Sequence, residues 1–413
     1  MVVANYDAVV IGLGPSGIMA TLTLLQKGYR VIGIDRGKSF EKRDSEIPYD
    51  VANGFGGAGL FSDGKLSFFP AASNLWANLE KSNLKEAYLS LQDEFKRIGY
   101  HIPDWQNHWT ISKQRNSKLT KRVKRYKTKY FDRKTCDDFI QDVYKRIQNN
   151  VILESEVILI TKNKDGTFQV FLDKSGEIPL TTNNIVLATG KVGNRILGLF
   201  ENLSFTTKAR FESGIRVETD CQNFRPYELK QIDYKYIETF ANGAEFRTFC
   251  CCKDGRVLES DYLSNVSFNG SITPRSTGRS NIGLTVRIEN EGSEIADEIK
   301  SCIRRQDEFV FDYNERYDNS RDFFIGPIFD QIILDRIGLI VKSKKAKYKT
   351  KIYGPEIEYW GNYPDFEWNS LRVSGENIWI VGDLSAKYRG LIAAMISGIY
   401  AANNIAQTIK EVD

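Results

Sequence analysis

The feature that most constrains this chain is a glycine-rich turn near its N-terminus. Residues 6–11 form an apolar run typical of a buried strand, and they lead without a gap into Gly12-Leu13-Gly14-Pro15-Ser16-Gly17. A helical spacing of apolar residues follows at Ile18, Leu22 and Leu25. A strand, a tight turn and a helix in this order are typical of α/β proteins, in which helices connect the strands of a parallel sheet.

The glycines of this turn have distinct physical roles. Gly12 makes the tight turn, Gly14 lets the backbone approach a pyrophosphate, and Gly17 lets the helix pack close to the strand. The free N–H groups and the positive dipole at the start of the helix favour a phosphate. A second apolar run, residues 29–34, ends at Asp35, whose carboxylate can accept hydrogen bonds from a ribose. The sequence therefore predicts dinucleotide binding by Gly12, Gly14, Pro15, Ser16, Gly17, Asp35 and Arg36.

Two motifs further along the chain indicate that this dinucleotide is FAD. An apolar run at 377–381 leads into Gly382-Asp383, and a helix of small and apolar residues follows Arg389. The carboxylate of Asp383 can bind a ribityl hydroxyl, and the helix N-terminus can stabilise negative charge at the flavin N1/O2 edge. Another buried strand, 184–187, ends in Ala188-Thr189-Gly190. We expect cofactor contacts from Thr189, Gly190, Gly382, Asp383, Gly390, Leu391 and Ile392.

Together these motifs resemble those of the glutathione-reductase-like FAD-dependent oxidoreductases. Within that superfamily the chain is most similar to a group of uncharacterised FAD-dependent dehydrogenases, on the segments 54–66, 214–218 and 247–252, with Asn269-Gly270 and Asn281 in addition. The resemblance implies an α/β fold with a discontinuous, Rossmann-type FAD-binding domain and an inserted α+β substrate domain. It also implies hydride transfer between the flavin N5 and a small organic substrate.

The domain boundaries follow from this resemblance and from the local patterns. We expect an FAD-binding domain formed by 1–70, 134–212 and 350–413, and a substrate domain formed by 71–133 and 213–349. In the first domain, strand-like alternation at 151–160 and 168–172 surrounds a turn at 163–166, and Val157 is expected beside the adenine. Helical spacing predicts helices at 84–98, 136–148 and 295–309.

A second glycine-rich loop, residues 54–65, carries four glycines within six residues. Such a loop permits close backbone approach to a ligand, and in the resembling flavoproteins this region lines the pyrophosphate and the isoalloxazine. We therefore assign Gly57, Ala58 and Lys65 to the cofactor site. Lys65 either places a positive charge near the flavin N1/O2 or N5 atoms, where it would also be catalytic, or forms a surface salt bridge after a turn.

A run of three cysteines offers a further candidate. On a strand, Cys250 and Cys252 would share one face while Cys251 points the other way. If the shared face met the flavin, Cys250 and Cys252 would be a redox pair or a nucleophile; the alternative is small buried residues in a core. We predict no metal site, because the only histidines, His101 and His108, lie far away in the sequence.

Arginine and tyrosine side chains are the candidates for binding the substrate. Arg389 directly precedes the helix expected at the flavin, where it would bind an anionic group or pair with Asp383. Arg216, Arg247 and Tyr388 are the other substrate-binding candidates. FAD is expected to bind non-covalently, because no His or Cys occupies a recognisable flavinylation position. A second glycine fingerprint is missing from the sequence, so NAD(P)H is at most a transient electron donor.

Two basic segments leave an alternative open. Residues 113–134 contain eleven Lys or Arg in 22 positions, with aromatic residues between them, and 342–351 is also rich in lysine. Such stretches can follow a phosphate backbone and stack bases, so a flavoprotein that binds or modifies nucleic acid is an alternative function. Two more alternatives are a monooxygenase and a module that keeps FAD as a structural element.

Composition and charge narrow the classes of protein to which this chain can belong. The 57 basic and 53 acidic residues leave a formal charge of +4, too small to indicate a nucleic-acid or membrane partner by itself. Six cysteines, three of them consecutive, are not spaced as a disulfide framework. The first residues carry no basic, apolar targeting pattern, and no apolar run approaches a membrane span of about 20 residues. We expect a cytoplasmic enzyme with a small-molecule substrate.

Overall fold

The predicted motifs follow strands of a parallel sheet. The computed structural model describes residues 5–109, 120–174, 178–191, 193–228, 233–241, 243–262, 265–273, 275–289, 309–313, 332–333, 335–343 and 349–412. The parallel strands lie in the order β21-β11-β2-β3-β7. Nearly all of their residues are buried, as expected for a sheet covered on both faces. These strands are β2 (Ala8–Ile11), β3 (Val31–Ile34), β7 (Val151–Ile152), β11 (Ile185–Leu187) and β21 (Ile378–Ile380).

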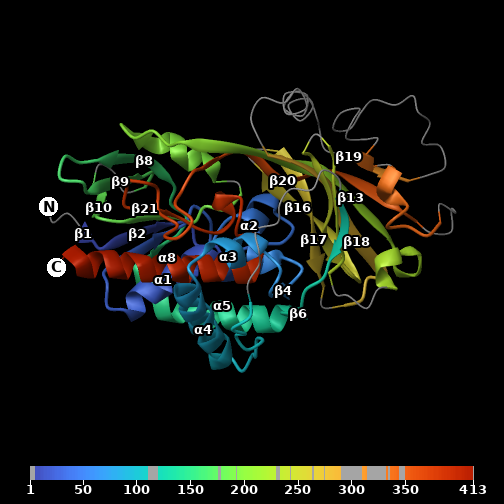
Figure 1. The fold of residues 1–413 in the computed structure, drawn as a ribbon, viewed down its shortest axis with the longest axis horizontal. Coiled ribbons are helices and arrows are strands. Elements are labelled where there is room, and N and C mark those ends of the chain that lie inside the picture. The colour runs from blue at the N-terminus through green and yellow to red at the C-terminus, as the bar shows by residue number, and fades with distance from the viewer. Residues whose placement is uncertain are drawn as a thin grey trace.

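Helices pack around this sheet and against one another (Figure 1). The helix α1 lies against α8 so closely that a Cβ atom at Gly398 would lie 2.0 Å from the Ser16 carbonyl oxygen. Glu94 of α4 accepts hydrogen bonds from Gln26 of α1 and from Arg146 of α5. The bounds are α1 (Pro15–Gln26), α2 (Pro48–Ala52), α3 (Ser73–Asn78), α4 (Lys81–Arg97), α5 (Arg133–Ile147) and α8 (Leu391–Val412). No helix in the described ranges is both long and apolar enough to cross a membrane.

A small mixed sheet, in the order β1-β10-β9-β8-β12, lies beside the parallel one, at the end of the molecule where α8 also ends (Figure 1). The predicted hairpin at 163–166 is confirmed, with Asn163 N–H donating to the Thr167 carbonyl. The run at 151–160 is not one strand, because β7 pairs with β3 while β8 joins the small sheet. The strands are β1 (Asn5–Tyr6), β8 (Val157–Lys162), β9 (Phe168–Leu172), β10 (Leu180–Thr182) and β12 (Phe200–Glu201).

A large antiparallel sheet, in the order β19-β20-β13-β18-β15-β14-β5, makes up the other end of the molecule (Figure 1). Because side chains alternate along a strand, one face of this sheet is apolar, with Val217 and Leu284 in its core, while the other carries buried charges such as Glu212 and Arg216. The strands are β5 (Thr120–Lys124), β13 (Thr207–Asp220), β14 (Lys235–Thr239), β15 (Glu245–Cys252), β18 (Arg279–Glu289), β19 (Phe309–Asp312) and β20 (Lys351–Pro364).

Two separate antiparallel pairs complete the described strands. One is the hairpin of β16 (Gly255–Tyr262) with β17 (Asn265–Ile272), and the other joins β4 (Lys65–Ser67) with β6 (Thr128–Tyr130), which are far apart in the sequence. The predicted helices at 84–98 and 136–148 are confirmed as α4 and α5, shifted by at most three residues. The helix expected at 295–309 lies outside the described residues except for Phe309, which is in β19. Apolar side chains of α3 and α4 pack with the parallel sheet, whereas β5 joins the large sheet. The domain division stays a prediction.

Candidate functional site

The structure brings the three predicted motifs together at the carboxyl ends of three neighbouring parallel strands, β2, β11 and β21. Gly12 has φ +95°, and a Cβ atom there would lie 2.6 Å from the Ala188 carbonyl oxygen. A Cβ atom at Gly17 would lie 1.8 Å from the Gly12 carbonyl oxygen. At Gly382 it would lie 2.5 Å from Ser16 Oγ. The glycines therefore permit a close approach of the segments 12–17, 188–190 and 382–383.

Asp35 holds this first turn and the second glycine-rich loop in place. Its Oδ2 accepts a hydrogen bond from Leu13 N at 2.8 Å, and its Oδ1 accepts from Gly37 N and Gly54 N, both at 2.9 Å. A carboxylate offers about four acceptor positions, so these bonds leave room for a ribose hydroxyl. The predicted acidic residue is thus also a structural link between two loops.

The residues expected near the adenine lie next to Asp35. Ser155 N donates to the Asp35 carbonyl at 3.2 Å, which fixes the segment that precedes β8. Arg36 Nε donates to Asn53 at 2.9 Å, and Arg36 Nη1 lies 3.5 Å from Glu156. Val157 is buried directly after this contact. The arrangement brings Arg36 close to the start of β8, and the adenine contact of Val157 stays a prediction.

The second glycine-rich loop is ordered by a buried arginine that the sequence did not reveal. Arg43 donates hydrogen bonds of 2.6–3.2 Å to the carbonyl groups of Asp50, Val51, Phe55 and Gly57. Burial lowers the pKa of Arg43 to about 10. Its acceptors are backbone atoms, which carry no residue signature, so no sequence pattern points to this role.

That loop lies between the starts of α1 and α8. A Cβ atom at Gly57 would lie 2.7 Å from Gly14 Cα, and one at Gly59 would lie 2.8 Å from Leu391 Cδ2. Thr189, in the segment 188–190, donates through Oγ1 to the Gly193 carbonyl. A cleft beside the loop is lined by Gly59, Leu60, Phe61, Ser62, Gly64, Phe131, Arg133, Cys136, Ser271 and Leu391.

Asp383 has a buried carboxylate oxygen that accepts no hydrogen bond in the described structure. Its Oδ1 atom is buried and has no hydrogen-bond partner, and it lies 3.5 Å from Arg389 Nε. Burial raises the pKa of Asp383. A buried acceptor without a donor is costly, and a ligand hydroxyl is a donor that would satisfy it. The residues present at the site therefore fit a ribityl chain.

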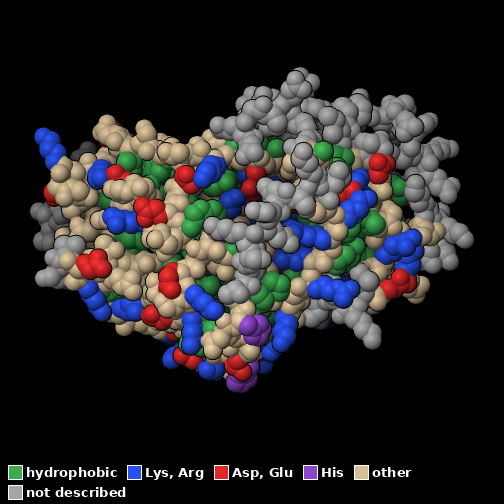
Figure 2. All heavy atoms as spheres, viewed as in Figure 1, with side chains coloured by type: hydrophobic (Ala, Val, Ile, Leu, Met, Phe, Trp, Pro, Cys, Tyr) green, Lys and Arg blue, Asp and Glu red, His purple; other side chains and the backbone are tan. Residues whose placement is uncertain are grey.

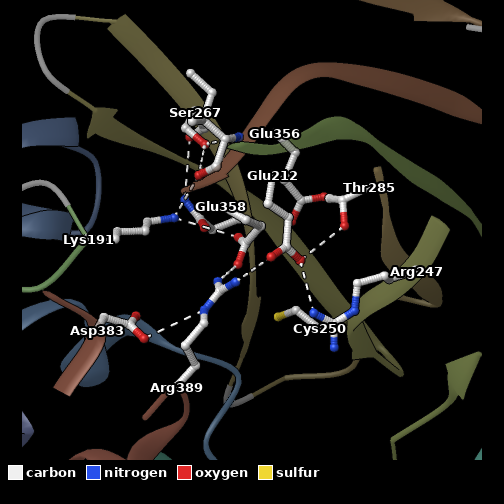
Figure 3. A network of polar contacts seen from close by, with 12 residues as sticks. Lys191, Glu212, Arg247, Cys250, Ser267, Thr285, Glu356, Glu358, Asp383 and Arg389 are labelled. Atoms are coloured by element: carbon white, nitrogen blue, oxygen red, sulfur yellow. Dashed lines mark hydrogen bonds and ion pairs between the residues drawn. The ribbon is translucent and has the colours of Figure 1, made fainter. Parts of the chain in front are cut away.

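Arg389 connects this turn with the charged face of the large sheet (Figure 3). Its Nη1 lies 3.0 Å from Glu212 Oε2, and its Nη2 donates to Glu358 Oε2. Lys191 approaches the other oxygen of Glu358 at 3.6 Å. Of the two predicted roles of Arg389, pairing with Asp383 is confirmed, but as one contact among several.

Glu212 is the centre of this charged face. Among the described residues, its Oε2 accepts hydrogen bonds from Arg210 at 2.5 Å, Arg287 at 2.9 Å and Arg389 at 3.0 Å. Burial opposes ionisation, but the charges of Arg287, Arg210 and Arg389 hold the pKa of Glu212 well below its usual value. Arg247 Nη1 lies 3.6 Å from the other oxygen. Glu212 is therefore a fully buried anion shared by several guanidinium groups.

A second buried carboxylate lies further along the same face. Glu356 Oε1 accepts from Arg216 Nη2 at 2.5 Å, while Glu356 Oε2 has no hydrogen-bond partner. Gly283 makes room for this carboxylate, since a Cβ atom there would lie 2.1 Å from Oε2. Burial raises the pKa of Glu356 to about 7. Arg216, a predicted substrate residue, thus has a structural partner, and it also donates to Asn281 at 2.6 Å.

Lys65 is buried rather than at the surface. Its side chain is 5% exposed, and Nζ lies 2.6 Å from Asp63, 3.0 Å from Asp233 and 2.8 Å from the Cys251 carbonyl oxygen. The other oxygen of Asp233 accepts from Tyr126 at 2.5 Å. The surface salt bridge considered for Lys65 is wrong, because both of its acidic partners are also buried. Its role at the flavin stays a prediction.

The cysteine run does not continue as a regular strand. Cys250 has φ +47°, and the pairing with β18 shifts between Phe249 and Cys252. This bulge, rather than simple alternation, brings the Sγ atoms of Cys250 and Cys252 within 4.8 Å of each other and of an Asp63 oxygen. The hydrogen bond with Cys250 raises the pKa of the Cys252 thiol well above its usual value. Cys252 therefore lacks the low pKa typical of a reactive thiolate.

Tyr388 lies apart from the charged face. It is fully buried in the apolar core around the parallel sheet, with its ring 6.2 Å from that of Phe366. Its hydroxyl has no hydrogen-bond partner in the described structure. By contrast, Arg247 and Arg389 both contact Glu212. Glu212, Glu356 and Glu358 were missed by the sequence reasoning, although the spacing of 356 and 358 on a strand would place both on one face.

The described parts of the basic segments make structural contacts. Lys121 pairs with Glu238, and Lys124 is half-buried and donates to Ser73. Residues 110–119 and 344–348 lie outside the described residues. Figure 2 shows Lys and Arg side chains interspersed with Asp and Glu over the described part of one face. Nucleic-acid binding by these segments stays a prediction.

Comparison with known proteins gives distant similarities. No family model matches the chain. An uncharacterized protein of Clostridium beijerinckii is 24% identical over 371 residues, which are 83% of this chain and 63% of that protein, so the chain spans less than two thirds of its length. L-α-glycerophosphate oxidase from Mycoplasma pneumoniae with FAD bound has a TM-score of 0.44 at 13% identity, covering 97% of this chain and 95% of that one. The FAD-bound form of OTEMO has a TM-score of 0.25 at 17% identity, covering 45% and 25%.

Proposed function

We propose that this chain is an FAD-dependent oxidoreductase. It binds FAD non-covalently where the segments 12–17, 188–190 and 382–383 meet, and it catalyses hydride transfer between the flavin N5 and a small anionic substrate. The observation that carries this proposal is the buried Oδ1 of Asp383, which accepts no hydrogen bond, beside a turn that is tight enough for a pyrophosphate. FAD, when bound, supplies a two-electron acceptor or donor.

The chain's own residues would hold the two ends of the cofactor. The backbone at Gly14 and the start of α1 would bind the pyrophosphate, since the helix dipole and free N–H groups favour an anion there. Asp35 and Asp383 would accept hydrogen bonds from the ribose and the ribityl chain. The start of α8, at Leu391, would lie beside the flavin N1/O2 edge and stabilise negative charge on it.

The charged face of the large sheet would form the substrate side. The carboxylates of this face are buried, and Arg389 links the face to Asp383 in the Gly382-Asp383 turn. Water is therefore largely excluded from the charged face. The guanidinium groups of Arg247 and Arg389 favour an anionic substrate over a cationic one. We assign the FAD-binding domain to 1–70, 134–212 and 350–413 and the substrate domain to 71–133 and 213–349 on this basis.

Anaerobic mixing with reduced nicotinamides tests the proposal. The purified protein should show the absorption bands of oxidised flavin, and NADH and NADPH are added separately while these bands are followed. Bleaching by either would identify a direct electron donor. A flavin that stays oxidised, but is bleached by an anionic metabolite, would identify a dehydrogenase or oxidase reduced by its own substrate. A colourless protein that takes up no FAD would overturn the proposal.

A further inference from the structure

The charged face carries a cluster of cations beside one aromatic ring. Lys235 Nζ lies 4.6 Å from the centroid of the Phe249 ring, and Arg389 Cζ lies 4.8 Å from it. Arg247 precedes Phe249 by two residues on β15, and it contacts Glu212, which also contacts Arg389. Lys235 and Arg389 thus lie beside the Phe249 ring, and Arg247 shares with Phe249 one face of β15. We call Lys235, Arg247, Phe249 and Arg389 the Phe249 cluster.

Arg247 is the member whose hydrogen bonds are least satisfied. Its side chain is 12% exposed, and its Nε and Nη1 atoms are buried without a hydrogen-bond partner. Its only ion pair among the described residues is with Glu212 at 3.6 Å, which is longer than a good charge-assisted hydrogen bond. Figure 3 shows the guanidinium group of Arg247 facing the group of carboxylates from the side of Cys250.

The other arginines on Glu212 have a second carboxylate, and Arg247 does not. Arg210 also pairs with Glu289, Arg287 with Glu245, and Arg389 with Glu358. In the described ranges no second acidic partner is found for Arg247. Because Glu212 already accepts three stronger bonds, the charge of Arg247 is left incompletely balanced in a buried place. Such a group requires an anion.

Lys235 adds a second incompletely balanced charge. The side chain is buried, and within the described part of the chain it forms no ion pair with a carboxylate. Burial lowers the pKa of Lys235 to about 8, with the charges of Arg287 and Arg389 acting in the same direction and those of Glu212 and Asp233 against it. An anion placed next to Lys235 and Arg247 would stabilise both cations.

We propose that the Phe249 cluster binds an oxyanion of the substrate, a carboxylate or a phosphate, with Arg247 and Lys235 as its ligands. Arg389 is held by its three carboxylate contacts and orients the cluster without donating to the anion. Phe249 forms an apolar wall that two cations cover. The inference rests on the proposed function only in naming this anion as a substrate group, since anion binding itself needs no flavin chemistry.

Calorimetric titration of the purified protein at constant ionic strength tests this inference. The probes are acetate and inorganic phosphate, with acetamide as the uncharged control. We expect saturable binding of at least one anion and no binding of acetamide. In Arg247→Met the affinity should fall about tenfold or more, because a hydrogen bond to a charged group is lost. The matched control Arg256→Met removes a half-exposed arginine paired with Glu46 and should bind as the wild type does.

Two further measurements distinguish a loss of anion binding from a loss of folding or of flavin. Arg247→Lys keeps the charge and should bind more weakly than wild type but more tightly than Arg247→Met; near-ultraviolet circular dichroism shows whether each variant is folded. Flavin content is measured on the same samples, so a colourless protein that binds the anion contradicts the proposed function and not anion binding by the Phe249 cluster. The inference is overturned if the folded wild type binds neither anion, or if folded Arg247→Met binds as tightly as wild type.

Discussion

At the scale of single residues, the site depends on buried polar groups whose partners come from distant parts of the chain. Arg43 donates to carbonyls that lie 7 to 14 residues further along the chain, and Glu356 of β20 accepts from Arg216 of the neighbouring strand β13, 140 residues away. The glycine turn and Asp35 were predictable because their roles depend on local spacing. Arg43, Glu212 and Glu356 were not, because their functions appear only once the strands have paired.

Glu356 gives a prediction about pH. Its pKa is raised from 4.5 to about 7 by burial, so the unfolded chain loses this proton first as the pH rises. The folded state then binds more protons than the unfolded one, and Glu356 lowers the free energy of unfolding progressively between pH 4.5 and about 7, by about 3 kcal/mol in total. In Glu356→Gln this loss should disappear. Urea unfolding of the wild type and of Glu356→Gln at pH 5 and pH 8 measures this change in the free energy of unfolding. Equal changes in both proteins would contradict the raised pKa of Glu356.

Arg43 gives a prediction about the loop. Replacement by Met leaves carbonyl groups in a buried loop without their donor, which should lower the free energy of unfolding by about 3 kcal/mol. Arg30→Met is the control, because Arg30 is 66% exposed and pairs with Asp7 at the surface, so its loss should cost less than about 1 kcal/mol. Chemical unfolding compares the two. Similar small losses in both variants would show that Arg43 does not hold the loop.

At the scale of elements, local periodicity predicted the helices and the strand that precedes the first turn. The helix α5 follows the spacing of Phe139, Val143 and Ile147, which are all buried. The large sheet was harder to predict, because β13 and β20 are buried on both faces and their charged residues interrupt the apolar pattern. The bulge at Cys250 also depends on pairing with β18 and has no signal in the local sequence.

The contact between β2 and α1 can be tested by adding a single methyl group. In Gly17→Ala the new Cβ would lie 1.8 Å from a backbone oxygen of Gly12, so turn and helix must separate. We expect a loss of about 3 kcal/mol in the free energy of unfolding, or insoluble protein. Gly198→Ala is the control, because nothing lies within 4 Å of its Cβ position. Equal melting temperatures for the two variants would contradict this packing.

At the scale of the whole molecule, Arg389 and Glu212 connect the two apolar cores. Arg389 precedes α8, which packs on the parallel sheet, and Glu212 lies in β13 of the large sheet. The sequence predicted that the two ends of the chain meet at the flavin, because the motifs themselves require it. It did not predict the charged face that the large sheet turns toward them, since that face forms only when several strands align.

Removing the charge of Glu212 should therefore affect the whole molecule. Glu212→Gln leaves Arg210, Arg287 and Arg389 without their shared anion, which should lower the free energy of unfolding by about 3 to 5 kcal/mol. Glu259→Gln changes an exposed residue of β16 and serves as the control. Denaturant titration gives both values. If Glu212→Gln is as stable as the control, the buried charge network does not hold the two parts together.

The central claim is that the three motifs form an FAD site, and the cofactor content of purified protein tests it most directly. Flavin released by heat is identified by mass spectrometry and quantified against protein for wild type, Asp383→Ala and Gly14→Val. Gly14 is suited to this test because a Cβ atom there has only an ordinary contact of 3.8 Å, to Gly57 Cα, and near-ultraviolet circular dichroism shows whether each variant is folded. We predict FAD close to stoichiometric amounts in the wild type and a marked loss in both variants. Full FAD content in both variants, or none in the wild type, would contradict the account.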